Sequence, residues 1–405
     1  MKQAVIKNKV VRDKRTFYNS LIPSDWEMST VGEAFEICNN LRLPISEEER
    51  KKIKGEFPYY GPTKIQDYIN EYRIEGRYAL IGEDGDHFLK WRELPMTLLV
   101  EGRFNVNNHA HIILGVDNLT DWFFYFFNHK ELTPYLTRQG AGRYKLTKDS
   151  LIKIPIVLPP LSEQKAITRV LSTWDDAIQK TEKLIAQKEL RKKWLMQQLL
   201  SGKRRLNGFK GEIKPKVVGQ YLNEVSEKNK ELKVSRVLSV TNSRGFINQS
   251  EQFDRTVASE DSSNYKIVRK GQFAYNPSRV NVGSLDLLRD FEVGILSPMY
   301  VVFATDEKFL LPDFLYYQLK TQWFYGYIPM FVQGSVRDSL SFEGLCSMKF
   351  FIPSIKEQTA IAQVLQTADK EISLLKSKAE RMREKKKGLL QQLLTGKKRL
   401  KINGN

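Results

Sequence analysis

The segment PPLSEQKAITRVLSTWDDAI, residues 159–178, returns later in the chain as PSIKEQTAIAQVLQTADKEI, residues 353–372. Glu163 in the first copy aligns with Glu357 in the second, an offset of 194 residues, and the alignment of the two segments needs no gap. Repetition of a whole segment over such a distance indicates two copies of one structural unit. The sequence therefore predicts a fold with an internal pseudo-twofold repeat.

The same offset continues on both sides of the repeated segment. Downstream it aligns QQLLSGKRRL, residues 197–206, with QQLLTGKKRL, residues 391–400. Upstream it still aligns Gln139 with Gln333, but it drifts nearer the start of the chain, which indicates insertions or deletions in a variable region. Each half is therefore predicted to be a variable domain followed by a stereotyped basic helix.

The repeated segments have the periodicity of long helices. Their apolar residues recur at steps of three and four, the seam of a coiled coil, and no proline lies inside either helical stretch. Ser162–Leu200 would form a helix of 39 residues, about 58 Å long, and the spacing of Ser354 and Glu357 predicts a capping box at the second helix. The side chains expected to pack against the other helix or a partner are Ile167, Leu171, Trp174 and Ile178 in the first helix, and Ile361, Leu365, Ile372 and Leu375 in the second.

The variable regions have the pattern of mixed domains. Short runs rich in β-branched and aromatic residues, such as Tyr78–Ile81 and Met299–Phe303, are typical of strands. Asp121–His129 and Asp313–Lys320 have the pattern of short aromatic helices. The predicted fold class is α+β, with two α/β domains that are separated and followed by long helices. The predicted bounds are 1–158 and 209–352 for the domains, and 159–208 and 353–405 for the helical regions.

The chain is long and basic. It has 405 residues, more than one hydrophobic core normally organises, and 65 Lys and Arg against 47 Asp and Glu give a formal net charge of +18. Such an excess favours a polyanionic partner, and nucleic acid is the leading candidate over an anionic membrane surface. The longest apolar runs, such as 122–127, are far shorter than the roughly 20 residues of a membrane-spanning helix.

Secretion and disulfide formation are not expected. The first 15 residues are basic but lack the apolar stretch of a signal peptide. Cys38 and Cys346 are the only cysteines, and they have no metal-like spacing. We therefore expect a cytoplasmic protein with two reduced thiols.

Three clusters resemble parts of enzyme sites, but each favours a simpler interpretation. Residues 276–279, Asn-Pro-Ser-Arg, lack the second proline and the aromatic residue of an amino-methyltransferase motif, so a turn near DNA is preferred. The acidic cluster at 83–87 could hold a divalent cation, but its glycines favour a tight turn. His109 and His111 could ligate zinc from one strand face, but no third ligand is in view, so packing or DNA contact is preferred. No metal site and no catalytic residue is predicted.

Basic and amide side chains in turn-rich segments are the candidate DNA contacts. Arginine suits guanine edges and phosphates, and asparagine suits adenine edges. A glycine-containing loop that occurs in both halves lets backbone N–H groups approach a phosphate, although it could simply be a turn. The basic runs 203–205 and 397–399 could contact DNA, a partner or only solvent. The candidate contacts are Arg42, Tyr60, Lys64, Arg138, Gln139 and Arg143 in the first domain, and Asn242, Arg244, Arg279, Asn281, Gln333 and Arg337 in the second.

In its motifs the chain resembles the specificity subunit of type I restriction-modification systems. The resemblance rests on the twice-used PPL-x-EQ or PSI-x-EQ opening and the QQLL-[ST]-GK close of each long helix. Smaller motifs agree, among them Tyr-Tyr-Gly at 59–61 and Ile-Gly-Glu-Asp-Gly at 81–85. The second domain departs from the first at 276–279, so base contacts are not transferred from one half to the other.

The resemblance implies two target recognition domains, each reading one half of a bipartite double-stranded DNA site, and helices that pack antiparallel and set the spacer. It also implies that two methylation subunits dock on the chain and that restriction or translocase subunits join them. The chain itself would be non-catalytic and would bind no cofactor, because S-adenosylmethionine, ATP and Mg²⁺ would bind to the partners. The alternative is a stand-alone regulatory or architectural DNA-binding protein that dimerises through its coiled coils.

Overall fold

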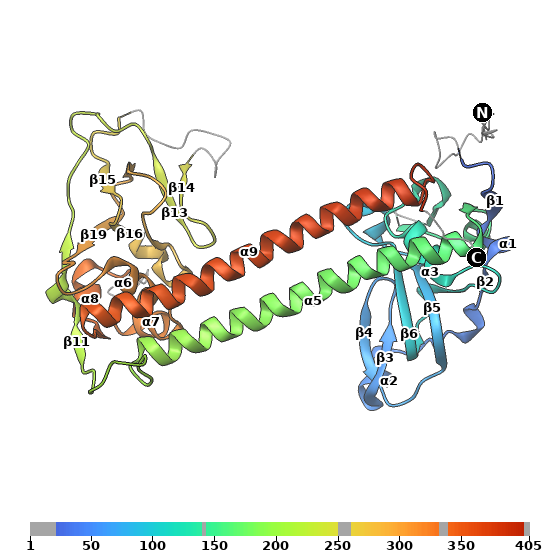
Figure 1. The fold of residues 1–405 in the computed structure, drawn as a ribbon, viewed down its shortest axis with the longest axis horizontal. Helices are drawn as coiled ribbons and strands as arrows, with labels where there is room; N and C mark the ends of the chain where they lie inside the picture. The colour runs from blue at the N-terminus through green and yellow to red at the C-terminus, as the bar shows by residue number, and fades with distance from the viewer. Residues whose placement is uncertain (1–21, 140–142, 250–260, 332–338, 401–405) are drawn as a thin grey trace, which may run out of the picture. The chain divides into compact units, whose positions relative to one another are not determined.

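The structure, a computed structural model, describes residues 22–139, 143–249, 261–331 and 339–400. It divides into two compact units: unit 1 comprises Met1–Lys180 and Lys378–Asn405, and unit 2 comprises Thr181–Ser377. Two long helices, α5 (Leu161–Leu200) and α9 (Ile355–Leu393), each contribute one half to each unit (Figure 1). Each unit thus holds one mixed domain, the first half of one long helix and the second half of the other.

The domain of unit 1 is built on a six-stranded sheet with the order β2-β7-β5-β6-β3-β4. Its long central pair, β5 (Ile74–Gly82) and β6 (Thr97–Val106), is antiparallel. Ala79 and Ile81 of β5 lie in one core cluster with the aromatic residues of α3 (Thr120–Phe127), whereas Leu80 belongs to a cluster on the opposite face. Both faces of the second half of β5 are therefore covered, which explains the continuous apolar sequence Tyr78–Ile81.

The other elements of this domain are short. The β1–β10 pair is antiparallel, with Met28 opposite Val157, and it leads directly into α5. The bounds are β1 (Glu27–Thr30), α1 (Val31–Ala34), β2 (Glu36–Ile37), α2 (Glu47–Lys52), β3 (Lys54–Tyr60), β4 (Ile65–Ile69), β7 (Ala110–Leu114), β8 (Thr137–Gln139), β9 (Arg143–Lys145), α4 (Lys148–Leu151) and β10 (Pro155–Leu158), with 3-10 turns at Asn39–Leu41, Asp86–Lys90 and Thr133–Tyr135.

The domain of unit 2 has a four-stranded sheet with the order β12-β19-β16-β17. Phe273 and Phe303 of neighbouring strands stack with their ring centroids 5.0 Å apart, and α6 (Pro312–Leu319) adds Phe314 and Tyr317 to the same core. The bounds of the other elements are β11 (Pro215–Val217), β12 (Leu222–Glu224), β13 (Leu238–Thr241), β14 (Gly245–Asn248), β15 (Lys266–Arg269), β16 (Phe273–Tyr275), β17 (Leu285–Leu287), β18 (Val293–Leu296), β19 (Val301–Thr305), α7 (Gln322–Tyr327), α8 (Phe342–Ser347) and β20 (Lys349–Phe351), with 3-10 turns at Val218–Tyr221, Pro277–Val282 and Ile328–Met330.

The predicted elements agree well with these bounds. The first long helix starts one residue before the expected Ser162 and ends at the expected Leu200. The strand expected over Met299–Phe303 begins only at Val301, because the backbone N–H of Tyr300 is bonded to the Ser297 carbonyl in a turn. The α+β fold class with its repeat is confirmed.

Within each unit the two helix halves run antiparallel. In unit 1, ion pairs join Glu163 to Arg399 and Asp175 to Lys386, so residue numbers rise along α5 as they fall along the partner segment. In unit 2 the same progression holds for Lys188–Glu371 and for Arg205–Glu357. The antiparallel packing expected from the family resemblance is therefore seen in both units.

The predicted packing residues lie in two environments. Those near the start of each helix pack into the adjacent domain core: Ile167 and Leu171 in unit 1, Ile361 and Leu365 in unit 2. Further along, Ile372 is buried, whereas Trp174, Ile178 and Leu375 are half-buried. The first helical turns therefore anchor the helices to the domains.

Candidate nucleic-acid interface and helix junctions

A buried glutamate at the start of each long helix binds an arginine from the end of the other helical region. Glu163, with a side chain only 1% exposed, accepts hydrogen bonds from Arg399 Nε at 2.6 Å and Nη2 at 2.7 Å. In unit 2, Glu357 is fully buried and accepts from Nε of Arg205 at 2.6 Å and also from its Nη2. The offset of 194 residues relates both pairs, so the contact is made twice with the same chemistry.

These contacts settle two expectations. From the sequence, the basic runs at 203–205 and 397–399 could contact DNA, a partner or solvent. In the structure, the last arginine of each run binds a buried carboxylate within the chain. The capping box predicted at Glu357 is wrong, because the backbone N–H of Glu357 is bonded to the Ser354 carbonyl at 2.9 Å and not to the Ser354 hydroxyl. The Glu357 carboxylate binds Arg205. A fork-shaped guanidinium that meets a carboxylate with two parallel bonds fixes orientation as well as distance.

A second pair of repeated contacts links the helices to the domains. Asp175 accepts from the Tyr125 hydroxyl of α3 at 2.8 Å and pairs with Lys386. In unit 2, Asp369 accepts from the Tyr317 hydroxyl of α6 at 2.8 Å and pairs with Lys192. Burial and the neighbouring carboxylate raise the pKa of both tyrosines, so each hydroxyl keeps its proton and donates. One aspartate in each unit therefore joins both helices to the domain.

The glutamine of each EQ motif holds the domain through its amide group. Gln164 Oε1 accepts from the backbone N–H of Leu119, immediately before α3, at 3.0 Å. Gln358 Oε1 accepts in the same way from Leu311, before α6, at 2.8 Å. Each amide N–H₂ donates to the carbonyl of the proline that precedes the helix, at 3.0 Å from Gln164 and at 2.9 Å from Gln358. The repeated EQ motif is thus a junction between helix and domain.

In the first domain, the candidate DNA contact Arg42 is part of an internal polar cluster. Its Nη2 lies 2.8 Å from Glu83 Oε2 and 2.9 Å from His111 Nδ1, and Lys145 Nζ lies 3.1 Å from the other oxygen of Glu83. Burial opposes ionisation of Glu83, but the hydrogen bond from Lys145 and the charge of Arg42 outweigh it and hold the pKa of Glu83 below its usual value. The Arg42 guanidinium therefore binds Glu83 and His111 within the domain.

His111 lies at the centre of this cluster and is completely buried. Burial lowers the pKa of His111 to about 4, so the ring is neutral at pH 7. With its Nε2 2.7 Å from the Leu146 carbonyl, the neutral tautomer that donates from Nε2 leaves Nδ1 to accept from Arg42 and Asn39. His109 is exposed and pairs with Asp84 at 2.8 Å. The two histidines therefore do not share one environment, as a zinc site would require.

The other candidates of the first domain lie on β3, on the β3–β4 turn and on the β8–β9 hairpin. Tyr60 is half-buried with its ring edge-on to Phe104, and Lys64 is exposed in the turn between β3 and β4. Arg138 is exposed on the β8–β9 hairpin and donates to the Tyr144 hydroxyl at 3.1 Å. Gln139 and Arg143 pair through their backbones at the tip of that hairpin. The hairpin is tied to the cluster, because Lys145 of β9 binds Glu83.

In the second domain, four predicted candidates lie on two neighbouring loops. Asn242 and Arg244 are exposed in the turn of the β13–β14 hairpin, and Arg279 and Asn281 are exposed on the 3-10 turn Pro277–Val282. Asn242 and Arg279 line one cleft of about 880 Å³. Gln333 and Arg337 lie outside the described residues. The cleft is thus the candidate DNA-reading surface of unit 2.

A glycine allows the two loops to approach each other. Gly283 ends the 3-10 turn with φ of 96°, a conformation that other residues rarely adopt. A Cβ atom there would lie 2.2 Å from Asn242 Oδ1. Asn276, which precedes the turn, is 9% exposed and accepts from the backbone N–H of Ser278, so its amide stabilises a turn.

The repeat and these junctions agree with the comparison to known families. The family described as type I restriction modification DNA specificity domain matches residues 23–189 and 260–382, more than half of the chain. The chain belongs to this family. As a specificity subunit, it carries two copies of the family's domain, one in each half of the repeat.

Curated relatives and a solved structure are consistent with this assignment. The type I restriction enzyme MjaVIII specificity subunit of Methanocaldococcus jannaschii is 23% identical over 94% of each chain. A Haemophilus influenzae protein named as a type I restriction enzyme specificity subunit is 37% identical, but the match spans only 40% of either chain. The crystal structure of a type I restriction-modification system S subunit from M. genitalium has a similar fold, with a TM-score of 0.61, 14% identity and coverage of 93% of this chain and 97% of that one.

Several functional contacts of this specificity subunit were not predicted. The repeat offset of 194 relates Asp175 to Asp369 and Lys192 to Lys386. The alignment of the two halves therefore already showed that these charged residues occur twice. Nothing in the sequence pairs Glu83 with Arg42 and Lys145. Among the described residues, no group of three His, Cys, Asp or Glu side chains could hold a metal ion. None of the described helices combines the length and apolar composition needed to cross a lipid bilayer.

Proposed function

We propose that this specificity subunit directs its complex to a bipartite double-stranded DNA site. The domain of unit 1 reads one half of the site and the domain of unit 2 reads the other, while α5 and α9 set the unread spacer. The observation that carries the proposal is the twice-made Glu–Arg junction, which gives both domains the same attachment to the long helices. Two domains that read different base sequences need the same attachment to the helices and different DNA-facing loops.

Charge and loop chemistry support contact with DNA. The formal net charge of +18 favours a polyanion. In unit 2, Asn242 and Arg279 present an amide and a guanidinium to one cleft, the groups suited to adenine and guanine edges. In unit 1, Arg138 and Lys64 are exposed near the β8–β9 hairpin and the β3–β4 turn. We expect the exposed cations mainly to position the duplex and the cleft residues to read bases.

The chemistry of the complex would belong to other chains. We infer that two methylation subunits dock on this subunit and that restriction or translocase subunits join them, with S-adenosylmethionine, ATP and Mg²⁺ bound by those partners. The specificity subunit would supply no catalytic residue, and the complex would act in the cytoplasm. The stand-alone alternative requires free helical seams for dimerisation. That requirement is not met within the units, where the described ion pairs bring the two helices of one chain together.

A map of methylated adenines tests the proposal. Cells that carry the complete system should show a split motif with two specified halves, and deletion of the gene for this subunit should abolish it. Catalytically intact methylation subunits remain in that strain, so loss of the motif reports recognition alone. A gene-independent motif would contradict the proposal.

A further inference from the structure

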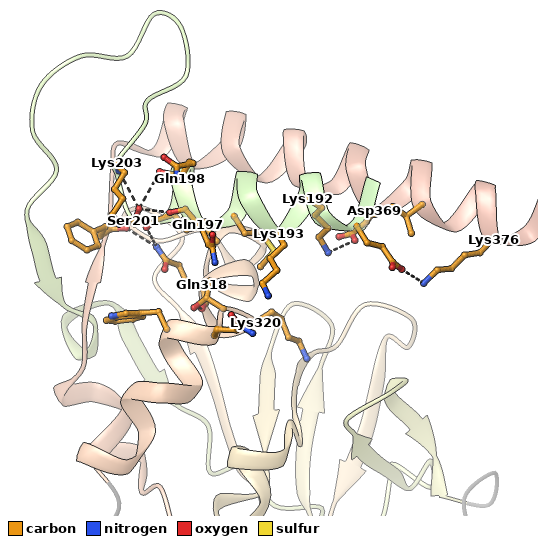
Figure 2. Close-up of a pocket in the computed structure, with 18 residues that line it drawn as sticks. Lys192, Lys193, Gln197, Gln198, Ser201, Lys203, Gln318, Lys320, Asp369 and Lys376 are labelled. Carbon is orange, nitrogen blue, oxygen red and sulfur yellow. Dashed lines mark hydrogen bonds and ion pairs between the residues drawn. The ribbon is translucent and has the colours of Figure 1, made fainter. Parts of the chain in front are cut away.

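Unit 2 contains a second cleft, of about 1060 Å³, that shares no residue with the candidate DNA-reading cleft. It is lined by the second half of α5, the first half of α9 and the segment from α6 to α7 (Figure 2). Five lysines surround it, against two carboxylates. They are Lys192, Lys193, Lys203, Lys320 and Lys376.

The two carboxylates are already paired. Asp369 binds Lys192 and the Tyr317 hydroxyl, and Glu189 lies 2.7 Å from Lys376. By contrast, neither Lys193 nor Lys203 has an ion-pair partner among the described residues, although both are exposed at the cleft. The cleft therefore offers uncompensated positive charge to a ligand.

The cleft also has apolar surface. Trp323 is 45% exposed, and its ring stacks on Tyr327 with centroids 4.8 Å apart. Met196 of α5 and Ile372 of α9 lie in the same lining. A held aromatic ring beside free ammonium groups suits an amphipathic chain segment, because the ring can cover an apolar side chain while the lysines bind carboxylates.

The repeat shows that this combination belongs to one half only. Tyr317 of unit 2 and Tyr125 of unit 1 are equivalent, because each donates to the repeated aspartate of its unit. Six residues after these tyrosines, unit 2 has Trp323 and unit 1 has Glu131. An acidic segment that fits unit 2 would meet the carboxylate of Glu131 at the corresponding place in unit 1.

We propose that this cleft binds an acidic segment with apolar side chains, supplied by one of the methylation subunits, and that it makes the two docking positions unequal in affinity. This inference rests on the proposed function. A sugar-phosphate backbone is the poorer occupant, because it offers no apolar group to Trp323, Met196 and Ile372. One methylation subunit then binds unit 2 more tightly than the other binds unit 1.

The repeat supplies a matched control for the test. The charge-reversal variant K193E/K203E alters the cleft, and K387E/K397E alters the corresponding exposed lysines in unit 1. Titration of the full-length subunit with the purified methylation subunit of its system, followed by native mass spectrometry, should resolve two binding steps. We expect K193E/K203E to weaken the tighter step roughly tenfold and to remove its salt dependence, with W323A having a similar effect. K387E/K397E should change that step less than about twofold.

Other outcomes would overturn the inference. Equal losses in both charge variants would mean that total charge matters and the cleft does not. A loss of duplex DNA affinity in K193E/K203E with unchanged methylation-subunit binding would assign the lysines to phosphate. Circular dichroism checks that the variants fold.

A peptide probe separates this inference from the proposed function. A short synthetic peptide of alternating glutamate and leucine, labelled for fluorescence anisotropy, should bind the wild-type chain and lose roughly tenfold in affinity for K193E/K203E. If the peptide binds in this way but no methylation subunit binds the chain, the cleft does bind acidic segments and the proposed function is wrong. If neither binds the cleft, the inference itself is wrong.

Discussion

Arg399 and Glu163 form a two-bond ion pair although 236 residues separate them in the sequence. Arg399 also reaches Asp25 with bonds of 2.7 and 2.8 Å, and Trp26 donates to the same Glu163 carboxylate at 3.0 Å. A residue close to the end of the described chain therefore holds residues near its start. The corresponding Arg205 has one carboxylate, Glu357, and the Gly211 carbonyl.

Replacement of Arg399 by alanine should destabilise unit 1. The change leaves Glu163 buried with only the Trp26 N–H as a hydrogen-bond donor, at a cost of about 3 kcal/mol in the free energy of unfolding. The low end of the usual range applies because the Arg399 side chain is 42% exposed. Urea unfolding followed by circular dichroism measures the change. The double variant R399M/E163L should recover most of the loss, and a double variant as unstable as R399A would argue against an unpaired carboxylate as the cause.

Unit 1 should lose stability as the pH falls from about 6.5 to about 4. The pKa of His111 is lowered to about 4 in the folded state from 6.5, so across this window the unfolded chain takes up a proton that the folded chain does not. The expected slope is at most about 1.4 kcal/mol per pH unit. Urea unfolding at several pH values measures it.

The pH slope has a matched control. His111→Asn should remove this contribution to the slope, whereas His109→Asn, at an exposed position, should leave it in place. If both variants keep the wild-type slope, His111 is not its source.

Arg279→Ala should change recognition of one half-site only. Loss of a guanidinium at the unit 2 cleft is expected to cost about 1–3 kcal/mol of binding free energy and to relax the sequence in that half. The methylation motif should then show one degenerate position in one half, with the other half unchanged. Arg138→Ala provides the comparison in unit 1, and the inference would be refuted by two variants that degrade the same half.

Matched insertions should lengthen the spacer between the half-sites. Four residues after Lys180 and four after Ser377 add about 6 Å to each helix and leave every described ion pair within its unit. With roughly 3.4 Å per base pair, we expect the spacer of the methylated motif to grow by one or two base pairs. An insertion in α5 alone should instead reduce activity, since it shifts the register of α5 against α9. Full activity with the original spacer would exclude the helices as the spacer-setting element.

The sequence by itself determined the repeat, the two long helices and the fold class. These features depend on local periodicity and on a duplicated pattern, which can be read along one chain: Ile167 and Leu171 recur at helical spacing, as do Ile361 and Leu365. The family assignment follows from the same motifs.

Only the tertiary structure decided which charges are used inside the fold. Arg42, Arg205 and Arg399 have the residue type of DNA contacts, yet each binds a carboxylate within its own unit. An arginine bonds a phosphate and a carboxylate with the same geometry, so its partner depends on which groups the folded chain brings within about 3 Å. Sequence spacing does not contain that distance, because the paired residues are far apart along the chain.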